Sequence, residues 1–193
     1  GKYGFYDLYK DNAAFRAVKD AAAHFASFNY ENLVVLGIGG SALGITALQT
    51  ALRPAYHNLM TRRGRKGLPR LFVMDNIDPE TFRAMMRLCP PGKTLYNVIS
   101  KSGGTAETIS QLMIVIEALE KKVGAKALKD HLVVTPSPKG KDAPKSLLHP
   151  VADAYNLLSF EIPLNVGGRF SVFSPVGMFP AALLGMDLDA MIA

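Results

Sequence analysis

A cluster of hydroxyl side chains is the strongest chemical feature of the sequence. Ser100, Ser102, Thr105 and Thr108 place four hydroxyl groups within nine positions, and Lys101 adds a positive charge among them. The residues that follow have the apolar spacing of a long helix, so the cluster stands at a helix N-terminus, where N–H groups lack partners and the helix dipole is positive. Hydroxyls and N–H groups gathered in this way bind a compact dianion, and the segment therefore predicts a phosphate-monoester site.

Helix capping is the alternative explanation for these hydroxyls. Ser102 with Thr105, or Gly104 with Glu107, has the spacing of a capping pair. Capping accounts for one or two hydroxyls rather than four, so phosphate binding is favoured. The segment is not a P-loop, because Lys101 precedes the glycines instead of following them.

A second segment that could approach an anion is the glycine-rich stretch 37–44, directly after an apolar run. Its glycines allow a tight turn and close backbone approach, and Gly40 stands beside Ser41, whose hydroxyl can cap the next helix or face a ligand. The stretch matches the GxGxxG pattern of dinucleotide sites only loosely. A tight strand-to-helix turn without a ligand explains this segment equally well.

A third segment places an arginine behind two glycines. Arg169 follows Gly167 and Gly168, on backbone that can come close to other groups. A guanidinium in that position suits an oxyanion or a developing negative charge. A surface arginine on a bulge is the alternative, and the pattern alone does not decide between them.

Five apolar runs predict the strands that must position these motifs. They are residues 33–36, 71–74, 95–99, 132–135 and 157–162. The first four are continuously apolar, as in strands buried on both faces of a parallel sheet. Segments with helical character alternate with them, at residues 13–28, 42–52, 79–88 and 105–122. This order predicts an α/β fold with a doubly wound, mainly parallel five-stranded sheet flanked by helices, and its ligands bind at the carboxyl ends of the strands.

Composition and charge exclude several classes of protein. The 193 residues are 49% hydrophobic and 20% charged, as in an ordinary globular protein of about one domain. No run approaches the roughly 18 apolar residues needed to cross a bilayer. The single cysteine, Cys89, has no partner for a disulfide and no neighbours at metal-ligand spacing, so a reducing cytoplasm is expected.

The net charge of +6 favours an anionic partner. Much of the excess lies between residues 62 and 70, where glycines and no aromatic residues separate the basic side chains. Nucleic-acid sites usually combine basic with stacking residues. A solvated basic loop is therefore expected here rather than a nucleic-acid patch.

Four segments together resemble the glucose-6-phosphate isomerase (phosphoglucose isomerase) family, which has the sugar isomerase fold. They are GIGGSALG at 37–44, DNIDP at 75–79, SKSGGTAET at 100–108 and VGGRFSVFSPVG at 166–177. The last is close to a diagnostic signature of that family, whereas the glycine- and serine-rich elements are shared by many sugar isomerase domains. The resemblance implies a helical lead-in at 1–30 and a sugar isomerase domain at 31–193, with the family's second domain absent.

The resemblance also implies a role for individual residues. The phosphate would be held by residues of the two glycine-containing loops, with one threonine at the edge of the pocket: Gly40, Ser41, Ser100, Lys101, Ser102, Thr105 and Thr108. Arg169 would be catalytic, stabilising the negative charge of an enediolate, and Glu107 would support the site. No metal and no other cofactor are implied.

The implied reaction interconverts glucose 6-phosphate and fructose 6-phosphate. In the family, a glutamate downstream of the GGR segment moves the proton, and no glutamate follows Arg169 in this sequence. We therefore expect the N-terminal portion of an isomerase, which binds sugar phosphate with little or no turnover. A cytoplasmic protein is expected, a homodimer at full length, without nucleic-acid or membrane partners. An exposed apolar face is expected within residues 179–192, because in the family that segment packs against the absent half.

Two alternatives share the same fold. Another enzyme with a sugar isomerase domain is disfavoured by the GGRFS and DNIDP segments. A non-catalytic sugar-phosphate sensor would normally carry a helix-turn-helix module, and no such segment is evident.

Overall fold

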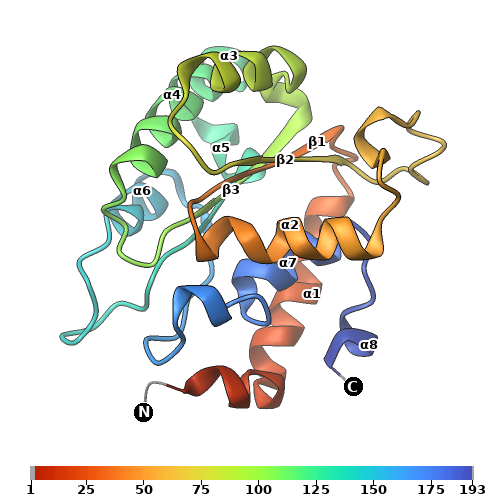
Figure 1. The fold of residues 1–193 in the computed structure, drawn as a ribbon. Helices are drawn as coiled ribbons and strands as arrows, with labels where there is room; N and C mark the ends of the chain where they lie inside the picture. Colours follow the sequence, from red (N-terminus) through yellow and green to blue (C-terminus); the bar gives the residue numbers. More distant parts are fainter. Residues whose placement is uncertain (1–2, 193) are drawn as a thin grey trace.

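The computed structural model describes residues 3–192, which form three layers with a parallel sheet in the middle (Figure 1). The strands stand in the order β2-β1-β3-β4-β5 and all pair in parallel. Their bounds are Asn32–Leu36 (β1), Arg70–Met74 (β2), Thr94–Ile99 (β3), Leu132–Thr135 (β4) and Leu158–Ser159 (β5). The predicted α/β class and the five-stranded parallel sheet are confirmed.

Helices cover both faces of this sheet (Figure 1). One face carries α3 (Pro79–Leu88), α4 (Ala106–Val123), α5 (Leu128–His131) and α6 (Leu148–Tyr155). The other carries α1 (Asn12–Ala26), α2 (Gly40–Leu52), α7 (Pro175–Leu183) and α8 (Leu188–Ile192). Short 3₁₀ helices complete the chain: η1 (Gly4–Lys10), η2 (His57–Leu59), η3 (Pro91–Lys93), η4 (Ala125–Ala127) and η5 (Gly168–Phe170).

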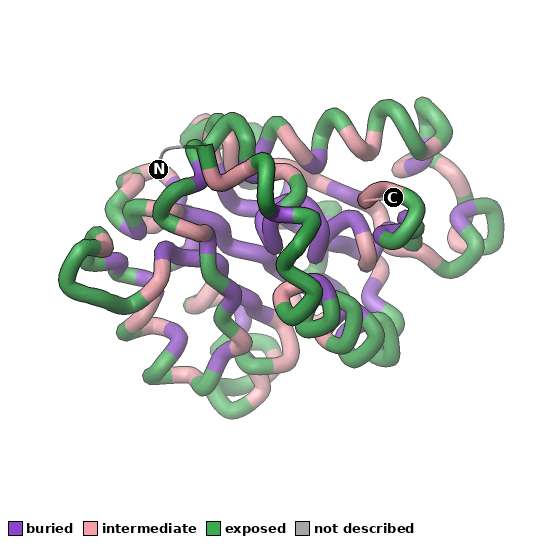
Figure 2. The backbone as a smooth tube through the Cα atoms, turned by 90° about the horizontal axis from the view of Figure 1, so that it is seen from below, coloured by how far each residue is buried: buried purple, intermediate pink, exposed green. Residues whose placement is uncertain are grey.

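The sheet separates two hydrophobic cores. In β1, Leu33 and Val35 enter the core shared with α1 and α7, whereas Val34 and Leu36 enter the core shared with α3 and α4. Successive side chains of a strand point to opposite faces, so a strand covered on both sides must be apolar at every position. Figure 2 shows the buried positions concentrated in the centre of the molecule, as this arrangement requires.

The fifth strand is shorter than the predicted run 157–162. Phe160 N still donates to Val134 O at 2.9 Å, and Ile162 N donates to Pro136 O at 2.8 Å. A parallel ladder would next need an N–H from residue 136, and proline has none. Pro136 therefore ends the reciprocal pairing after Ser159, although the chain continues beside β4.

The prediction of an exposed apolar face within residues 179–192 is wrong. Phe179 and Leu184 are fully buried, and they belong to the core beneath the sheet. The ring of Phe179 contacts Phe25 of α1 at a centroid distance of 6.0 Å and Phe160 at 5.0 Å. The N-terminal helix α1 occupies the surface that was expected to be open, because its own apolar stripe packs on α7.

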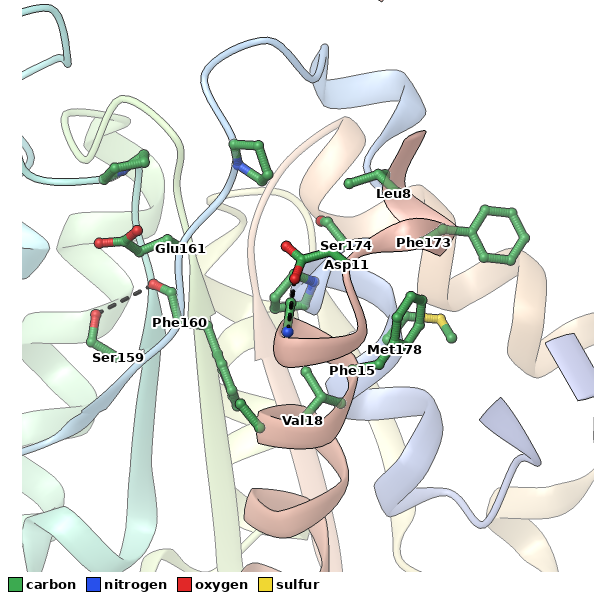
Figure 3. A pocket seen from close by; sticks show the side chains of 15 residues that line it. Leu8, Asp11, Phe15, Val18, Ser159, Phe160, Glu161, Phe173, Ser174 and Met178 are labelled. Atoms are coloured by element: carbon green, nitrogen blue, oxygen red, sulfur yellow. Dashed lines mark hydrogen bonds between the residues drawn. The ribbon is translucent and has the colours of Figure 1, made fainter. Parts of the chain in front are cut away.

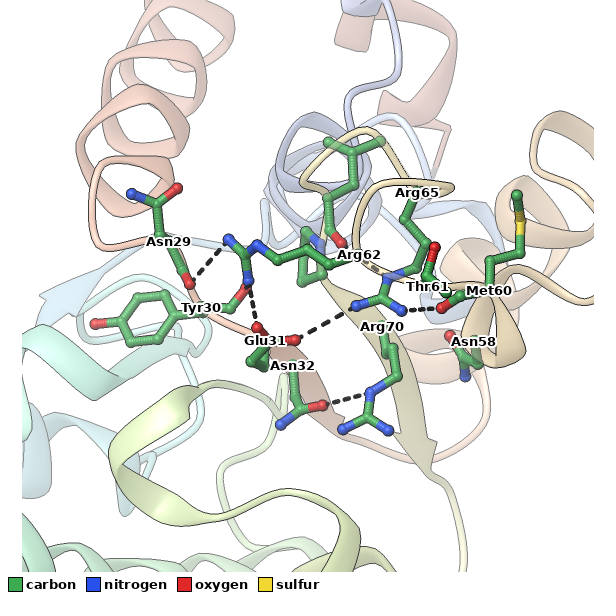
Figure 4. A network of polar contacts seen from close by, with 12 residues as sticks. Asn29, Tyr30, Glu31, Asn32, Asn58, Met60, Thr61, Arg62, Arg65 and Arg70 are labelled. Carbon is green, nitrogen blue, oxygen red and sulfur yellow. Dashed lines mark hydrogen bonds and ion pairs between the residues drawn. The ribbon is translucent and has the colours of Figure 1, made fainter.

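The basic segment between α2 and β2 is not simply a solvated loop (Figure 4). Arg62 Nη1 lies 2.7 Å from Glu31 Oε1, and Arg65 Nη2 lies 3.4 Å from Glu31 Oε2. Arg65 is only 6% exposed, and it also donates to the backbone carbonyls of Leu68, at 3.0 Å, and Met60. Two of the arginines therefore tie the segment to the residue that precedes β1.

We predict that Arg65→Met destabilises the fold much more than Arg63→Met, since Arg63 is exposed. The substitution leaves the carbonyls of Met60 and Leu68 without their donor. Unpaired buried groups of this kind cost about 1–3 kcal/mol. Equilibrium urea unfolding of the two variants measures the difference, and equal midpoints would show that the arginine network contributes nothing.

Candidate functional site

The strand order creates a crevice between β1 and β3. These strands are neighbours, so the loops at their carboxyl ends lie side by side. The helix after β1, α2, covers one face of the sheet, whereas the helix after β3, α4, covers the other (Figure 1). Sheets with this order bind ligands at the point where the chain leaves neighbouring strands towards opposite faces.

A cavity of about 410 Å³ lies at this crevice. Its lining combines both loops with parts of two later segments: Ile38, Gly40, Ser41, Ile99, Ser100, Lys101, Ser102, Thr105, Pro144 and Gly168. Six of the seven residues predicted to bind substrate are among them, and no lining residue is acidic. The cavity is therefore polar on its loops and carries a positive charge from Lys101.

The structure places the other three predicted site residues outside this lining. Thr108 is 1% exposed within α4, and its Oγ1 has no hydrogen-bond partner. Glu107 is half-buried in the first turn of the same helix. Arg169 is exposed on η5, one residue after Gly168, which does line the cavity.

Both helices that begin at the cavity lack a side-chain cap. The N-cap of α2 is Gly39, with φ at 58°, so Ser41 lies inside the first turn and does not cap the helix. The N-cap of α4 is Thr105, and its side chain makes no capping hydrogen bond. In contrast, side chains cap α1, α3 and α7. The N-terminus of α4 thus directs its first N–H groups and its dipole to the cavity. In α2, Ser41 N already donates to Ile38 O at 3.2 Å and Ala42 N to Gly39 O at 3.0 Å, so this helix contributes mainly its dipole and the N–H group of Gly40.

The hydroxyls of the loop after β3 divide into two kinds. Ser100 is buried and shapes the loop, because its Oγ accepts from Gly103 N at 3.1 Å and lies 3.2 Å from Thr105 Oγ1. Ser102 is exposed, and its Oγ accepts a weaker bond from Gly104 N at 3.3 Å. Ser102 and Thr105 therefore present the hydroxyl groups most open to a ligand.

Two glycines bring the arginine segment against the start of α2. A Cβ placed on Gly40 would lie 2.1 Å from the carbonyl oxygen of Gly168 and 2.8 Å from its Cα, so only glycine fits at position 40. Ser171 Oγ donates to the same Gly168 carbonyl at 2.7 Å and fixes the turn. This backbone contact brings Gly168, the residue before Arg169, into the lining of the cavity.

Four residues of the lining were not predicted as site residues: Ile38, Ile99, Pro144 and Gly168. The sequence indicated that the backbone at Gly168 could come close to another group. It did not indicate that this group is Gly40. Pro144 lies in the loop that follows the carboxyl end of β4, and this position was the only signal for it in the sequence.

A second cavity, of about 400 Å³, lies between the start of α1, the end of β5 and the start of α7 (Figure 3). Its lining is mainly apolar and includes Phe15 and Met178. Two of its polar side chains are already used as helix caps, since Asp11 accepts from Ala14 N and Ser174 accepts from Val176 N. This cavity contains none of the predicted site residues.

Other chemistries find little support in residues 3–192. No group of three or more His, Cys, Asp or Glu side chains in that range is placed to hold a metal ion. No helix there is long and apolar enough to cross a membrane. Burial raises the pKa of Cys89 to about 12, so this thiol stays protonated and unreactive near neutral pH.

The fold is that of an α/β protein of the doubly wound class, with a polar cavity between two helix N-termini. Comparison with known proteins specifies the family, because the family model for phosphoglucose isomerase matches residues 18–190. The chain therefore belongs to the phosphoglucose isomerase family.

Individual relatives agree with this assignment. The glucose-6-phosphate isomerase of Carboxydothermus hydrogenoformans is 42% identical over 194 residues, which cover 100% of this chain and 40% of the relative. A glucose-6-phosphate isomerase of Thermus thermophilus is 38% identical, over 98% of this chain and 41% of the relative. The chain thus spans about two-fifths of the length of the curated relatives that it matches.

Solved structures show the same fold. A hypothetical protein from Thermus thermophilus superposes with a TM-score of 0.83 at 37% identity, over 99% of this chain and 41% of that structure. A glucose-6-phosphate isomerase from Chlamydia trachomatis gives a TM-score of 0.64 at 27% identity, over 94% of this chain and 33% of that structure.

Proposed function

We propose that the chain is the N-terminal, sugar-phosphate-binding part of a glucose-6-phosphate isomerase, which interconverts glucose 6-phosphate and fructose 6-phosphate. The observation that carries the proposal is the cavity between the uncapped N-termini of α2 and α4, lined by the hydroxyls of Ser41, Ser102 and Thr105. The family membership of the chain supports the same substrate class.

The phosphate group of the substrate occupies this cavity. Its dianionic oxygens accept hydrogen bonds from the hydroxyls of Ser41, Ser102 and Thr105 and from the N–H group of Gly40 at the start of α2. Lys101 adds positive charge, and the absence of acidic side chains from the lining avoids repulsion. Glu107 supports the site from the first turn of α4 without touching the ligand. Thr108 does not bind the ligand, because its side chain is buried within the protein and does not line the cavity.

Arg169 acts on the reacting end of the sugar. With the phosphate held between the two helices, the carbon chain of an open sugar extends towards η5, where Arg169 follows Gly168. Its guanidinium stabilises the negative charge of the enediolate formed between C1 and C2. This arrangement places charge stabilisation and phosphate anchoring on different loops of one edge of the sheet.

We assign the proton transfer between C2 and C1 to a glutamate outside these residues, because no glutamate follows Arg169 in the sequence. The part of the relatives that the chain does not span would contain this base and complete the pocket. The reaction requires no cofactor. We further propose that the full-length protein is a homodimer and is located in the cytoplasm.

The proposal predicts that the chain binds fructose 6-phosphate but not fructose, because the phosphate supplies the charge that the two helix N-termini recognise. Isothermal titration with both ligands measures this difference, and a coupled isomerase assay of the same sample is expected to give no turnover. Equal affinity for the two ligands, or none for either, would contradict phosphate recognition. Turnover would place the catalytic base within these residues.

A further inference from the structure

The side chain of Lys101 joins the phosphate loop to the segment that carries Arg169. Its Nζ donates to the carbonyl oxygen of Leu164 at 2.9 Å and to that of Val166 at 2.8 Å. Two of the three ammonium N–H groups are therefore engaged by backbone more than sixty residues further along the chain. Val166 is the residue directly before the Gly167–Gly168 pair.

The segment held in this way has mainly short-range bonds of its own. Val166 N donates to Pro163 O at 3.1 Å, and Phe170 N donates to Gly167 O at 2.9 Å. Such turns set the local shape of the backbone. Two other segments also touch it, since Gly4 N of η1 donates to Asn165 O at 3.1 Å and Gly168 packs against Gly40 of α2, but neither contact involves β3. Because Lys101 stands at the carboxyl end of β3, a rigid part of the sheet, its two bonds supply that connection.

We propose that Lys101 is a positioning residue, whose ammonium holds the backbone before Arg169 at a set distance from the phosphate cavity. The inference rests on the proposed function and adds to it a role that the motif alone does not indicate, since Lys101 was expected only to bind phosphate. The same loop thus anchors the phosphate and places the guanidinium over the reacting carbons. Displacement of a group by about 1 Å from its productive position can cost 100-fold in rate.

The contact predicts different effects on two ligands. Inorganic phosphate fills only the cavity, whereas 5-phosphoarabinonate, a sugar acid phosphate, also carries a carboxylate where the enediolate oxygens would form. Lys101→Met keeps the length of the side chain without its donors, and we expect it to weaken 5-phosphoarabinonate about tenfold more than inorganic phosphate. Lys101→Arg retains donors and should restore most of the loss. Ser102→Ala, the matched control, should weaken both ligands by a similar factor.

Amide hydrogen exchange gives a second measurement that needs no ligand. In Lys101→Met, the amides of residues 166–171 should exchange faster than in the unmodified chain, whereas Ser102→Ala and Lys101→Arg should leave them unchanged. A similar loss of affinity for both ligands, with unchanged exchange, would overturn the proposal and make Lys101 a direct phosphate ligand. If the unmodified chain binds neither ligand, the proposed function fails, and the exchange rates alone decide whether Lys101 holds the segment.

Discussion

Replacing Gly40 with alanine is expected to destabilise the fold and to abolish ligand binding. The new methyl group would lie 2.1 Å from the carbonyl oxygen of Gly168, which is backbone and cannot rotate away. Either α2 or η5 must move, and both border the cavity. Overpacking against backbone of this kind costs about 3 kcal/mol. For a chain of this size, that loss lowers the melting temperature by about 6–12 °C.

The matched control for this substitution is Gly104→Ala. A Cβ on Gly104 meets no atom within 4 Å, and the residue stands in the loop on the other side of the same cavity. Thermal and urea unfolding of the two variants should separate them clearly, with Gly104→Ala close to the unmodified chain. Equal stability of the two would show that α2 and η5 do not touch at Gly40 and Gly168.

Removing both open hydroxyls of the loop after β3 should eliminate sugar-phosphate binding. Ser102→Ala/Thr105→Ala deletes two donors to a dianion, and each hydrogen bond to a charged group contributes about 1.5–3 kcal/mol. A total of at least about 3 kcal/mol corresponds to a loss of affinity of roughly 100-fold or more. Stability should fall only slightly, because Ser102 is exposed and Thr105 makes no capping bond, although its Oγ1 lies 3.2 Å from Ser100 Oγ.

Thr108→Val is the control for the double variant. Its Oγ1 is buried without a partner and does not line the cavity. An isosteric apolar side chain should therefore leave the affinity for fructose 6-phosphate unchanged, and it should not lower stability. Isothermal titration of the three proteins tests both expectations. If Thr108→Val weakened binding as much as the double variant, the phosphate would lie deeper along α4 than we propose.

Much of the fold could be predicted because its strands are buried on both faces. The runs at β1 to β4 were located to within a residue, since a strand covered by helices on both sides must be apolar throughout. The bounds of α3 were also predicted, because Pro79 at the first helical position is a local signal. The loops that line the cavity followed from the rule that ligands bind at the carboxyl ends of parallel strands.

What could not be predicted depends on contacts between distant segments. The end of β5 is set by Pro136 of the neighbouring strand, and the burial of Arg65 depends on Glu31. The burial of Phe179 depends on α1, which lies at the other end of the chain. Spacing and composition contain no information about such pairs.

The contact between Lys101 and Val166 belongs to the same class. The sequence marked both segments as candidates for anion chemistry, but it did not show that one holds the other.

A crystal structure of the chain with fructose 6-phosphate would test the location of the site most directly. We expect the phosphorus atom in the cavity between the N-termini of α2 and α4, within reach of Ser102 and Thr105, and the sugar carbons directed towards Arg169. Density for the ligand in the apolar cavity beside Phe15 and Met178 would contradict the proposed site.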